Sequence, residues 1–408
     1  MTEIRFAYCL AAVIGLMCAC GARGDVTAVP ADPAISSTAQ QALSAADLGN
    51  ELAKVGPEVD KLVQNPTNPG IVNMVRQWLI AQDPSAASNP YQNAYTDALN
   101  TAFVNALNQP DVPINSKLNM GIVIASLAGP KTNLAPTILK LLQDGNTMVA
   151  LQGVKAAGAM LPLSLQDPNF NAGLRDPVLA AIIAVASNHP DGPLAGEIAG
   201  GAYRAINPSM WTAGAMPAGG ALTALIDANL KLQANRLQIY QNVGVPPYPK
   251  ADSFASYFLL SGATWPVMNT AEQTSAVQQA VNLISFSGQR YSASPQALNT
   301  NRDLIDSLQS QGKWIQVLGG ILNDQNISQV GAAVYHLSPA MPVSTVQTAC
   351  NQVYGAIQEN QAFSAITQPP TIAGGASPPS AGTAPSGTTP GSASNNSTDS
   401  SPTSAVQP

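Results

Sequence analysis

The chain has 408 residues, of which 45% are hydrophobic and only 10% are charged, and its formal net charge at pH 7 is −6. It carries no cluster of Lys and Arg, so nucleic acid, which requires concentrated positive charge, is not an expected partner. A chain of this length holds either two or three ordinary domains or one continuous array of repeats.

Residues 1–20 have the features of an export signal. An uninterrupted apolar run of 15 residues ends at Cys20, and this is shorter than the roughly 20 residues that a membrane-spanning helix needs. The segment Met17-Cys18-Ala19-Cys20 resembles a bacterial lipobox. This motif predicts a lipid on Cys20 and a membrane-anchored lipoprotein of the cell envelope. Ordinary cleavage near Ala22 is the alternative, and it predicts a periplasmic or secreted protein.

Residues 21–36 contain Gly and Pro with little apolar content, which predicts a flexible spacer. Residues 37–206 form a predicted helical repeat region, in which apolar residues recur every three to five positions. Breaks are expected at Gly56-Pro57 and Asp83-Pro84. Asp176-Pro177 is predicted to begin a helix, with Asp176 as the N-cap. The other helices expected here cover 69–79, 91–107, 116–128, 134–142, 148–161 and 194–206.

Residues 133–161 are the most informative part of the chain. They comprise an apolar helix, a tight Asp144-Gly145-Asn146 turn and a second helix rich in small residues. Such a hairpin cannot bury both of its apolar faces by itself, so it indicates a stack of similar hairpins. The first-helix prolines Pro136 and Pro177 lie 41 residues apart, within the range of about 40–47 residues for helical repeats. A similar turn recurs at Asp324-Gln325-Asn326.

On these residues the chain resembles the HEAT-repeat family. The similarity is good over 133–161, fair over 91–128, 172–206 and 313–336, and absent elsewhere. It implies an all-α fold, an α-solenoid of helical hairpins. The family is structural, so the resemblance implies binding surfaces and no particular chemistry.

Residues 207–250 interrupt the pattern with several glycines and prolines around one strong helix at 221–240. This segment is predicted to be an insertion or a junction. Residues 251–367 form a second predicted helical repeat region, in which Gly312 is expected to separate helices at 295–309 and 313–322. Residues 368–408 are almost entirely Pro, Gly, Ser, Thr, Ala and Asn, which predicts a disordered tail.

Few residues suggest chemistry. The two histidines, His189 and His336, are expected in a surface turn and at a helix end. Cys350 lies at helical spacing from valines and is expected to be a buried apolar residue. The carboxylate pairs Glu51/Glu58 and Asp303/Asp306 are expected on solvated helix faces. No catalytic residue, metal ligand or cofactor is therefore predicted.

The tryptophans divide into two groups. Trp78 and Trp314 occur at helical spacing with apolar residues and are expected in the core. Trp211 and Trp265 lie beside prolines and glycines of predicted loops, where a ring can be partly exposed. These two are the candidate ligand or partner contacts.

Together, these patterns predict a non-catalytic, exported binding or scaffold protein with an unidentified protein partner. One alternative is an envelope enzyme with a site near residues 207–265. The other is a purely structural spacer.

Overall fold

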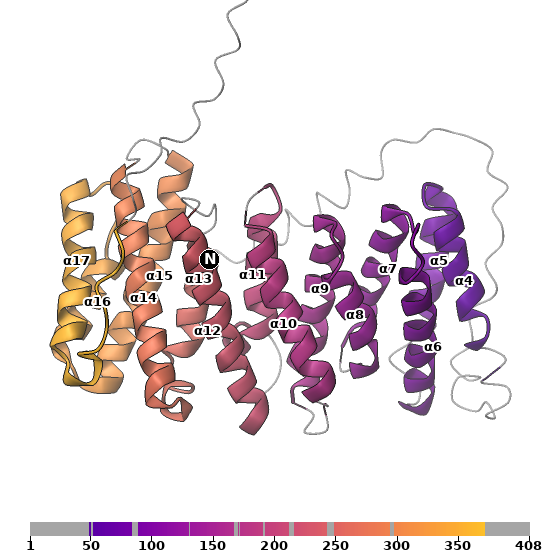
Figure 1. Cartoon of the computed structure of the whole chain (residues 1–408), viewed down its shortest axis with the longest axis horizontal. Coiled ribbons are helices and arrows are strands. Elements are labelled where there is room, and N and C mark those ends of the chain that lie inside the picture. Colours follow the sequence, from indigo (N-terminus) through magenta and orange to yellow (C-terminus); the bar gives the residue numbers. More distant parts are fainter. Residues whose placement is uncertain are drawn as a thin grey trace, which may run out of the picture. The chain divides into compact units, whose positions relative to one another are not determined.

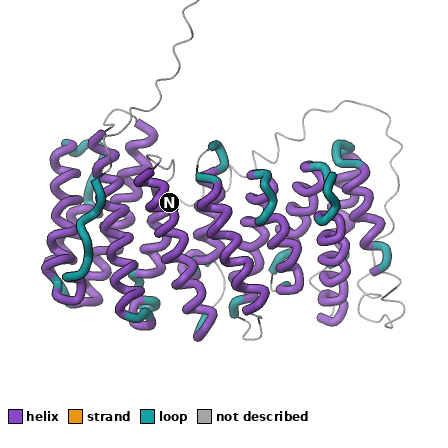
Figure 2. The backbone as a smooth tube through the Cα atoms, viewed as in Figure 1, coloured by secondary structure: helices purple, strands orange, loops and turns teal. Residues whose placement is uncertain are grey.

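A computed structural model describes residues 49, 52–83, 89–129, 131–166, 170, 172–190, 192–211, 216–242, 249–293 and 298–371. These residues belong to one compact unit that extends to Ala373. Their regular secondary structure is entirely helical (Figures 1 and 2), which confirms the all-α prediction. The predicted signal peptide, Cys20, the spacer and all but the first residues of the predicted tail lie outside the described residues.

The described part of the chain contains fourteen α-helices and four short 3-10 helices. The first seven α-helices are α4 (Val55–Gln64), α5 (Pro69–Ala81), α6 (Asn89–Leu107), α7 (Ile114–Leu127), α8 (Ala135–Leu142), α9 (Thr147–Ser164) and α10 (Ala172–Asn188). The other seven are α11 (Ala195–Ile206), α12 (Gly219–Asn242), α13 (Pro249–Leu259), α14 (Thr270–Ala293), α15 (Leu298–Leu322), α16 (Gln325–Tyr335) and α17 (Val343–Glu359). The 3-10 helices are η1 (Thr132–Leu134), η2 (Pro208–Met210), η3 (Trp265–Val267) and η4 (Gln361–Phe363).

The helices of this unit pack in two rows. One row has the contact order α4, α6, α8, α10, α12, α14 and α17, and the other has the order α5, α7, α9, α11, α13 and α15. Helix α16 packs on α15 and on α17. The apolar core lies between the rows and is nearly continuous from Val55 to Ile366. Among the described helices, none is long and apolar enough to cross a membrane.

Local sequence explains where several helices begin. The side chain of Asn68 accepts hydrogen bonds from the backbone N–H groups of Gly70 and Ile71, and Pro69 follows at the first helical position. The side chain of Asn146 caps α9 in the same way. In the similar turn before α16, however, the cap is Asp324 rather than the asparagine two residues later. The two turns therefore share a sequence pattern but not a cap position.

Small residues allow close packing between helices, as the hairpin at 133–161 predicted. A Cβ atom added at Gly153 of α9 would lie 2.7 Å from the backbone nitrogen of Leu142 in α8. The expected helices at 91–107, 116–128, 134–142 and 148–161 are confirmed to within a few residues.

Two predicted helix boundaries are wrong. Helix α10 begins at Ala172, so Pro177 lies inside it and Asp176 is not its N-cap. Proline lacks a backbone donor and crowds the carbonyl four residues earlier, and here both effects fall in the first two turns of α10. Helix α15 is continuous through Gly312. A Cβ there would lie 2.4 Å from the backbone nitrogen of Tyr335, so this glycine permits close approach of α16 instead of ending a helix.

The segment 207–250, expected to be an insertion or a junction, contributes α12 to the first row. Helix α12 contacts α10 on one side and α14 on the other, as its neighbours in the row do. The chain before it is fixed by Asn207, whose side-chain amide donates to the carbonyl of Phe254 in α13.

Candidate functional site

Two grooves flank helix α10. The first lies between α10 and α12 and has a volume of about 550 Å³. The second lies between α8 and α10 and has a volume of about 630 Å³. Ala180 lines both grooves, and its side chain and that of Ala184 are exposed. Helix α10 is therefore a narrow ridge of small side chains with a hollow on each side.

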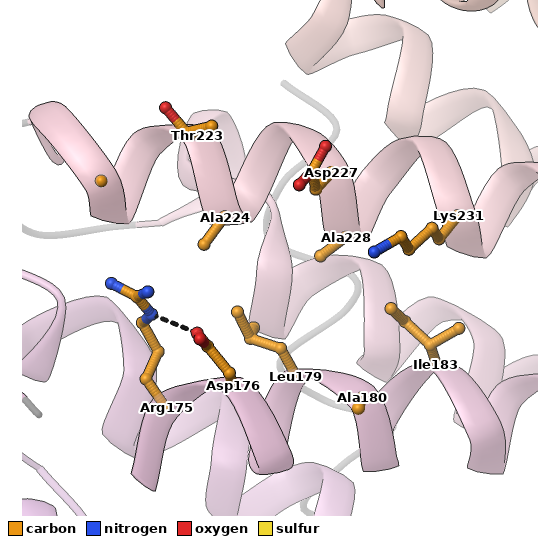
Figure 3. A pocket seen from close by; sticks show the side chains of 11 residues that line it. Arg175, Asp176, Leu179, Ala180, Ile183, Thr223, Ala224, Asp227, Ala228 and Lys231 are labelled. Carbon is orange, nitrogen blue, oxygen red and sulfur yellow. Dashed lines mark hydrogen bonds and ion pairs between the residues drawn. The ribbon is translucent and has the colours of Figure 1, made fainter. Parts of the chain in front are cut away.

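The first groove has an apolar centre and charged ends. In Figure 3, Leu179 of α10 faces Ala224 and Ala228 of α12 across the space between the helices. At one end Arg175 donates from Nε to Asp176 Oδ1 at 2.7 Å. Asp227 and Lys231 contribute charge from the α12 side. This arrangement suits an apolar ligand surface with polar groups near its ends.

The second groove ends at the turn between α8 and α9. Asp144 and His189 line this end, while Pro177, Ala184 and Val185 line the α10 side. His189 is half-buried, and its Nδ1 lies 3.2 Å from Thr147 Oγ1. The expected surface-turn histidine thus forms part of a groove wall.

A buried polar cluster fixes the position of α12, which is one wall of the first groove. Asp252 of α13 accepts from Arg236 of α12 at 2.8 Å (Nε to Oδ1) and 3.2 Å (Nη2 to Oδ2). The hydroxyl of Tyr203 in α11 donates to Asp252 at 3.1 Å, and that of Tyr240 in α12 donates at 2.8 Å. All four residues are buried. One carboxylate therefore joins three helices.

Burial and charge keep Arg236 and the two tyrosines in single protonation states. Burial raises the pKa of both Tyr203 and Tyr240 well above 10, and the negative charge of Asp252 raises each further. Burial alone would lower the pKa of Arg236, but the charge of Asp252 and the hydrogen bonds to it raise that pKa above its usual value. The guanidinium consequently stays charged and both phenols stay protonated donors at ordinary pH.

The structure places the two predicted contact tryptophans against different partners. The ring N–H of Trp211 donates to the carbonyl of Arg204 at 2.9 Å, and the ring is half-buried against the core. Trp265 is only 5% exposed and packs edge-to-face on Phe363. The expected exposure of Trp265 is therefore wrong, because η4 covers its ring. A ligand role for Trp211 stays a prediction.

Trp78 and Cys350 are buried as the sequence predicts, whereas Trp314 packs against the core without being fully covered. Trp78 is buried, and Trp314 is half-buried with its ring edge-to-face against Tyr257 at 4.6 Å. Cys350 is buried and has no disulfide partner among the described residues, and burial raises the pKa of its thiol to about 12. A thiol with this pKa is inert at neutral pH.

The expectation for Glu58 is wrong. Its side chain is buried and accepts a hydrogen bond from Lys61, one turn later in α4. Glu51 lies outside the described residues. Asp303 and Asp306 are half-buried, and Asp306 pairs with Lys250 at 3.2 Å. His336 is the C-cap of α16 and is exposed, as predicted for a histidine at a helix end.

Within the described ranges, no three His, Cys, Asp or Glu side chains are grouped so that they could hold a metal ion. The sequence matches no protein-family model, and a comparison with curated proteins found no match. Sequence reasoning missed the two grooves, whose residues lie between 142 and 231. The one available signal was the run of alanines in α10, which periodicity alone cannot divide into buried and exposed positions.

Proposed function

We propose that the protein is a non-catalytic binding or scaffold protein of the bacterial cell envelope, and that it recognises a protein partner through the grooves beside α10. The observation that carries this proposal is the ridge itself, because Ala180 lines both grooves. We further propose that the two rows form an α-solenoid of HEAT-like hairpins, in which each hairpin buries its apolar faces against its neighbours. Beyond the described residues, the remainder of the predicted tail at 368–408 would follow it as a disordered segment.

A protein partner suits this surface better than a small molecule. A small molecule would occupy one groove, whereas a protein surface can cover the ridge and place apolar side chains on both sides of it. Exposed alanines at 180 and 184 let the partner's backbone come close. The charges of Arg175, Asp176 and Lys231 near the first groove would orient the partner more than they strengthen its binding.

Site-specific crosslinking in cells that naturally produce the protein tests this proposal. A photoreactive amino acid is placed at Ala180 in one chain and at Ala333, an exposed alanine of α16 that lines neither groove, in a control chain. We expect one dominant protein adduct from position 180 and not from position 333. The substitution Ala180→Arg, which places a long charged side chain on the ridge between the two grooves, should abolish copurification of that protein, whereas Ala333→Arg should not.

The proposal fails if position 180 gives no adduct, which would favour a structural spacer. It also fails if positions 180 and 333 capture the same proteins equally. Thermal melting of both arginine variants shows whether each chain keeps its fold.

Export rests on the sequence alone. We propose that Cys20 is lipidated and tethers the helical unit to a membrane, with a periplasmic or secreted protein as the alternative. Intact mass and fractionation of the wild-type chain beside Cys20→Ala distinguish the two. A lipid-modified mass and release of the variant from the membrane fraction support the anchor, and an unmodified, soluble wild type contradicts it.

A further inference from the structure

The chain that follows η4 lies in a groove between α14 and α17. In Figure 2 it is the long teal segment that crosses the C-terminal helices. Gln278 of α14 holds Thr367 by its main chain: the N–H of Thr367 donates to Gln278 Oε1 at 2.7 Å, and Gln278 Nε2 donates to the carbonyl of Thr367 at 3.0 Å. Further along, Gln289 Nε2 donates to the carbonyl of Pro370 at 3.3 Å.

The segment does not fill this groove. A space of about 370 Å³ remains, lined on the helix side by Ser285, Gln289, Gln347 and Asn351, and on the segment side by Gln368, Pro369 and Thr371. Its floor is set by close helix packing, because a Cβ added at Gly288 of α14 would lie 2.8 Å from Cys350 Sγ in α17. Beyond Ile366, which belongs to the core, the segment therefore leaves part of the groove open.

The contacts show what the groove recognises. The two glutamines bind backbone N–H and C=O groups, which every extended peptide presents, and Gln278 Oε1 also accepts from Thr367 Oγ1 at 3.2 Å. The covered side chains of the segment are Ile366, which is 3% exposed, and Pro369, which is half-buried. Thr367, Gln368 and Pro370 remain exposed. Hydrogen bonds in contact with water contribute little net stability, so residues 367–371 are held weakly and Ile366, which packs in the core, anchors the segment.

We propose that the groove between α14 and α17 is a binding site for extended peptides of the pattern Ile-Thr-x-Pro-Pro, and that residues 366–371 are its displaceable occupant within the chain. Prolines favour an extended backbone before binding, which reduces the entropy lost when such a peptide is ordered. The proposal is independent of the grooves beside α10, because it rests on different helices and on contacts already formed.

A peptide-binding measurement tests it. The probe is a fluorescent ten-residue peptide with the sequence of residues 364–373, and binding is followed by anisotropy. In the full chain, Thr367→Pro removes both the N–H group and the hydroxyl that donate to Gln278 Oε1, so the chain's own segment is expected to leave the groove. We expect the peptide to bind the Thr367→Pro chain at least roughly tenfold more tightly than the wild-type chain, where the tethered segment competes at high effective concentration.

Two controls define the site. Adding Gln278→Ala to the Thr367→Pro chain should weaken peptide binding by about tenfold or more, because the amide that pairs with the peptide main chain is lost. Adding Gln358→Ala, at an exposed position of α17, should leave binding unchanged. A probe that itself carries proline in place of Thr367 should not bind.

The proposal is overturned if a natively melting Thr367→Pro chain does not bind the probe, or if it binds both probes equally. If Thr367→Pro does not fold, the wild type supplies the test. Excess unlabelled peptide should then accelerate hydrogen exchange at the chain's own Thr367 amide, and an unchanged exchange rate would overturn the proposal.

Discussion

Asp252 is the residue on which the buried polar contacts of α11, α12 and α13 converge. We predict that Asp252→Asn lowers the free energy of unfolding by about 3–5 kcal/mol, because it leaves the buried guanidinium of Arg236 without its counter-charge. Urea denaturation at neutral pH measures the change. The first groove should also widen or lose definition, because Asp252 fixes its α12 wall.

Asp306→Asn is the matched control for this prediction. Asp306 also pairs with a basic side chain, Lys250, but that pair is largely exposed. Exposed pairs contribute at most about 1 kcal/mol, so this variant should melt nearly as the wild type does. If both variants lost the same free energy of unfolding, burial would not explain how much the Arg236–Asp252 pair contributes to stability.

Asp324 is the N-cap of α16, and its carboxyl group should make a small part of the free energy of unfolding depend on pH. Hydrogen bonds from the Asn360 side chain and from the backbone N–H of Ile327 lower the pKa of its carboxyl group. Because this pKa is lower in the folded chain, the carboxylate stabilises the fold above about pH 4 and loses that contribution as pH falls through the folded-state pKa. At pH 7, Asp324→Asn should cost roughly 0.3–1 kcal/mol.

The measurement is the difference in unfolding free energy between wild type and Asp324→Asn from pH 7 to pH 2.5. Other carboxyl groups titrate equally in both chains, so the difference isolates Asp324. It should shrink towards zero at the acid end. A difference that stays constant with pH would contradict the assignment of the lowered pKa to this residue.

At the scale of elements, the α15–α16 pair depends on glycines. A Cβ at Gly319 would lie 2.4 Å from the backbone nitrogen of Ser328, whereas a Cβ at the neighbouring Gly320 would meet nothing within 4 Å. Gly319→Ala should therefore destabilise the protein by about 1–3 kcal/mol through overpacking. Gly320→Ala should stabilise it by up to about 1 kcal/mol, because alanine is the better helix former. Opposite shifts in melting temperature are expected, and shifts of the same sign would contradict close backbone packing here.

These glycines also show where sequence reasoning stops. The spacing of apolar residues and the turn residues between 91 and 161 locate four helices, because the prolines, glycines and asparagines in the connections between these helices mark real boundaries. In sequence, Gly312 looks the same as a glycine that ends a helix. Only its closeness to Tyr335 in α16 shows that it permits tight packing instead. No local pattern distinguishes these two uses of glycine.

The candidate site was beyond prediction for a related reason. Arg236 and Asp252 lie in different helices, and no motif links them in the sequence. Exposure of Ala180 and burial of Ala181 depend on which neighbours α8 and α12 supply. Grooves of this kind arise from the packing of three helices, whereas periodicity describes one helix at a time.

At the scale of the whole helical unit, contacts are local in the order of helices. The substantial contacts join described helices at most three positions apart, so α4 packs with α5, α6 and α7, while α17 packs with α14 and α16. If stability follows this order, the two ends open separately. Leu62 of α4 is fully buried, so Leu62→Ala creates a cavity that lowers the free energy of unfolding by about 2–5 kcal/mol. We predict that this variant leaves the alkylation rate of Cys350 in α17 nearly unchanged.

Cys350 is a suitable reporter because its buried thiol, with a pKa of about 12, reacts only after local opening exposes it and restores its ordinary acidity. Iodoacetamide labelling followed by peptide mass spectrometry measures its rate beside any other cysteine. Gly288→Ala is the positive control, because the added Cβ would lie 2.8 Å from Cys350 Sγ and should speed labelling. If Cys350 were exposed only by global unfolding, the loss of unfolding free energy in Leu62→Ala would raise the labelling rate by a corresponding factor. A measured increase of that size would show that the unit unfolds as one cooperative body. In that case the local order of contacts does not govern its stability.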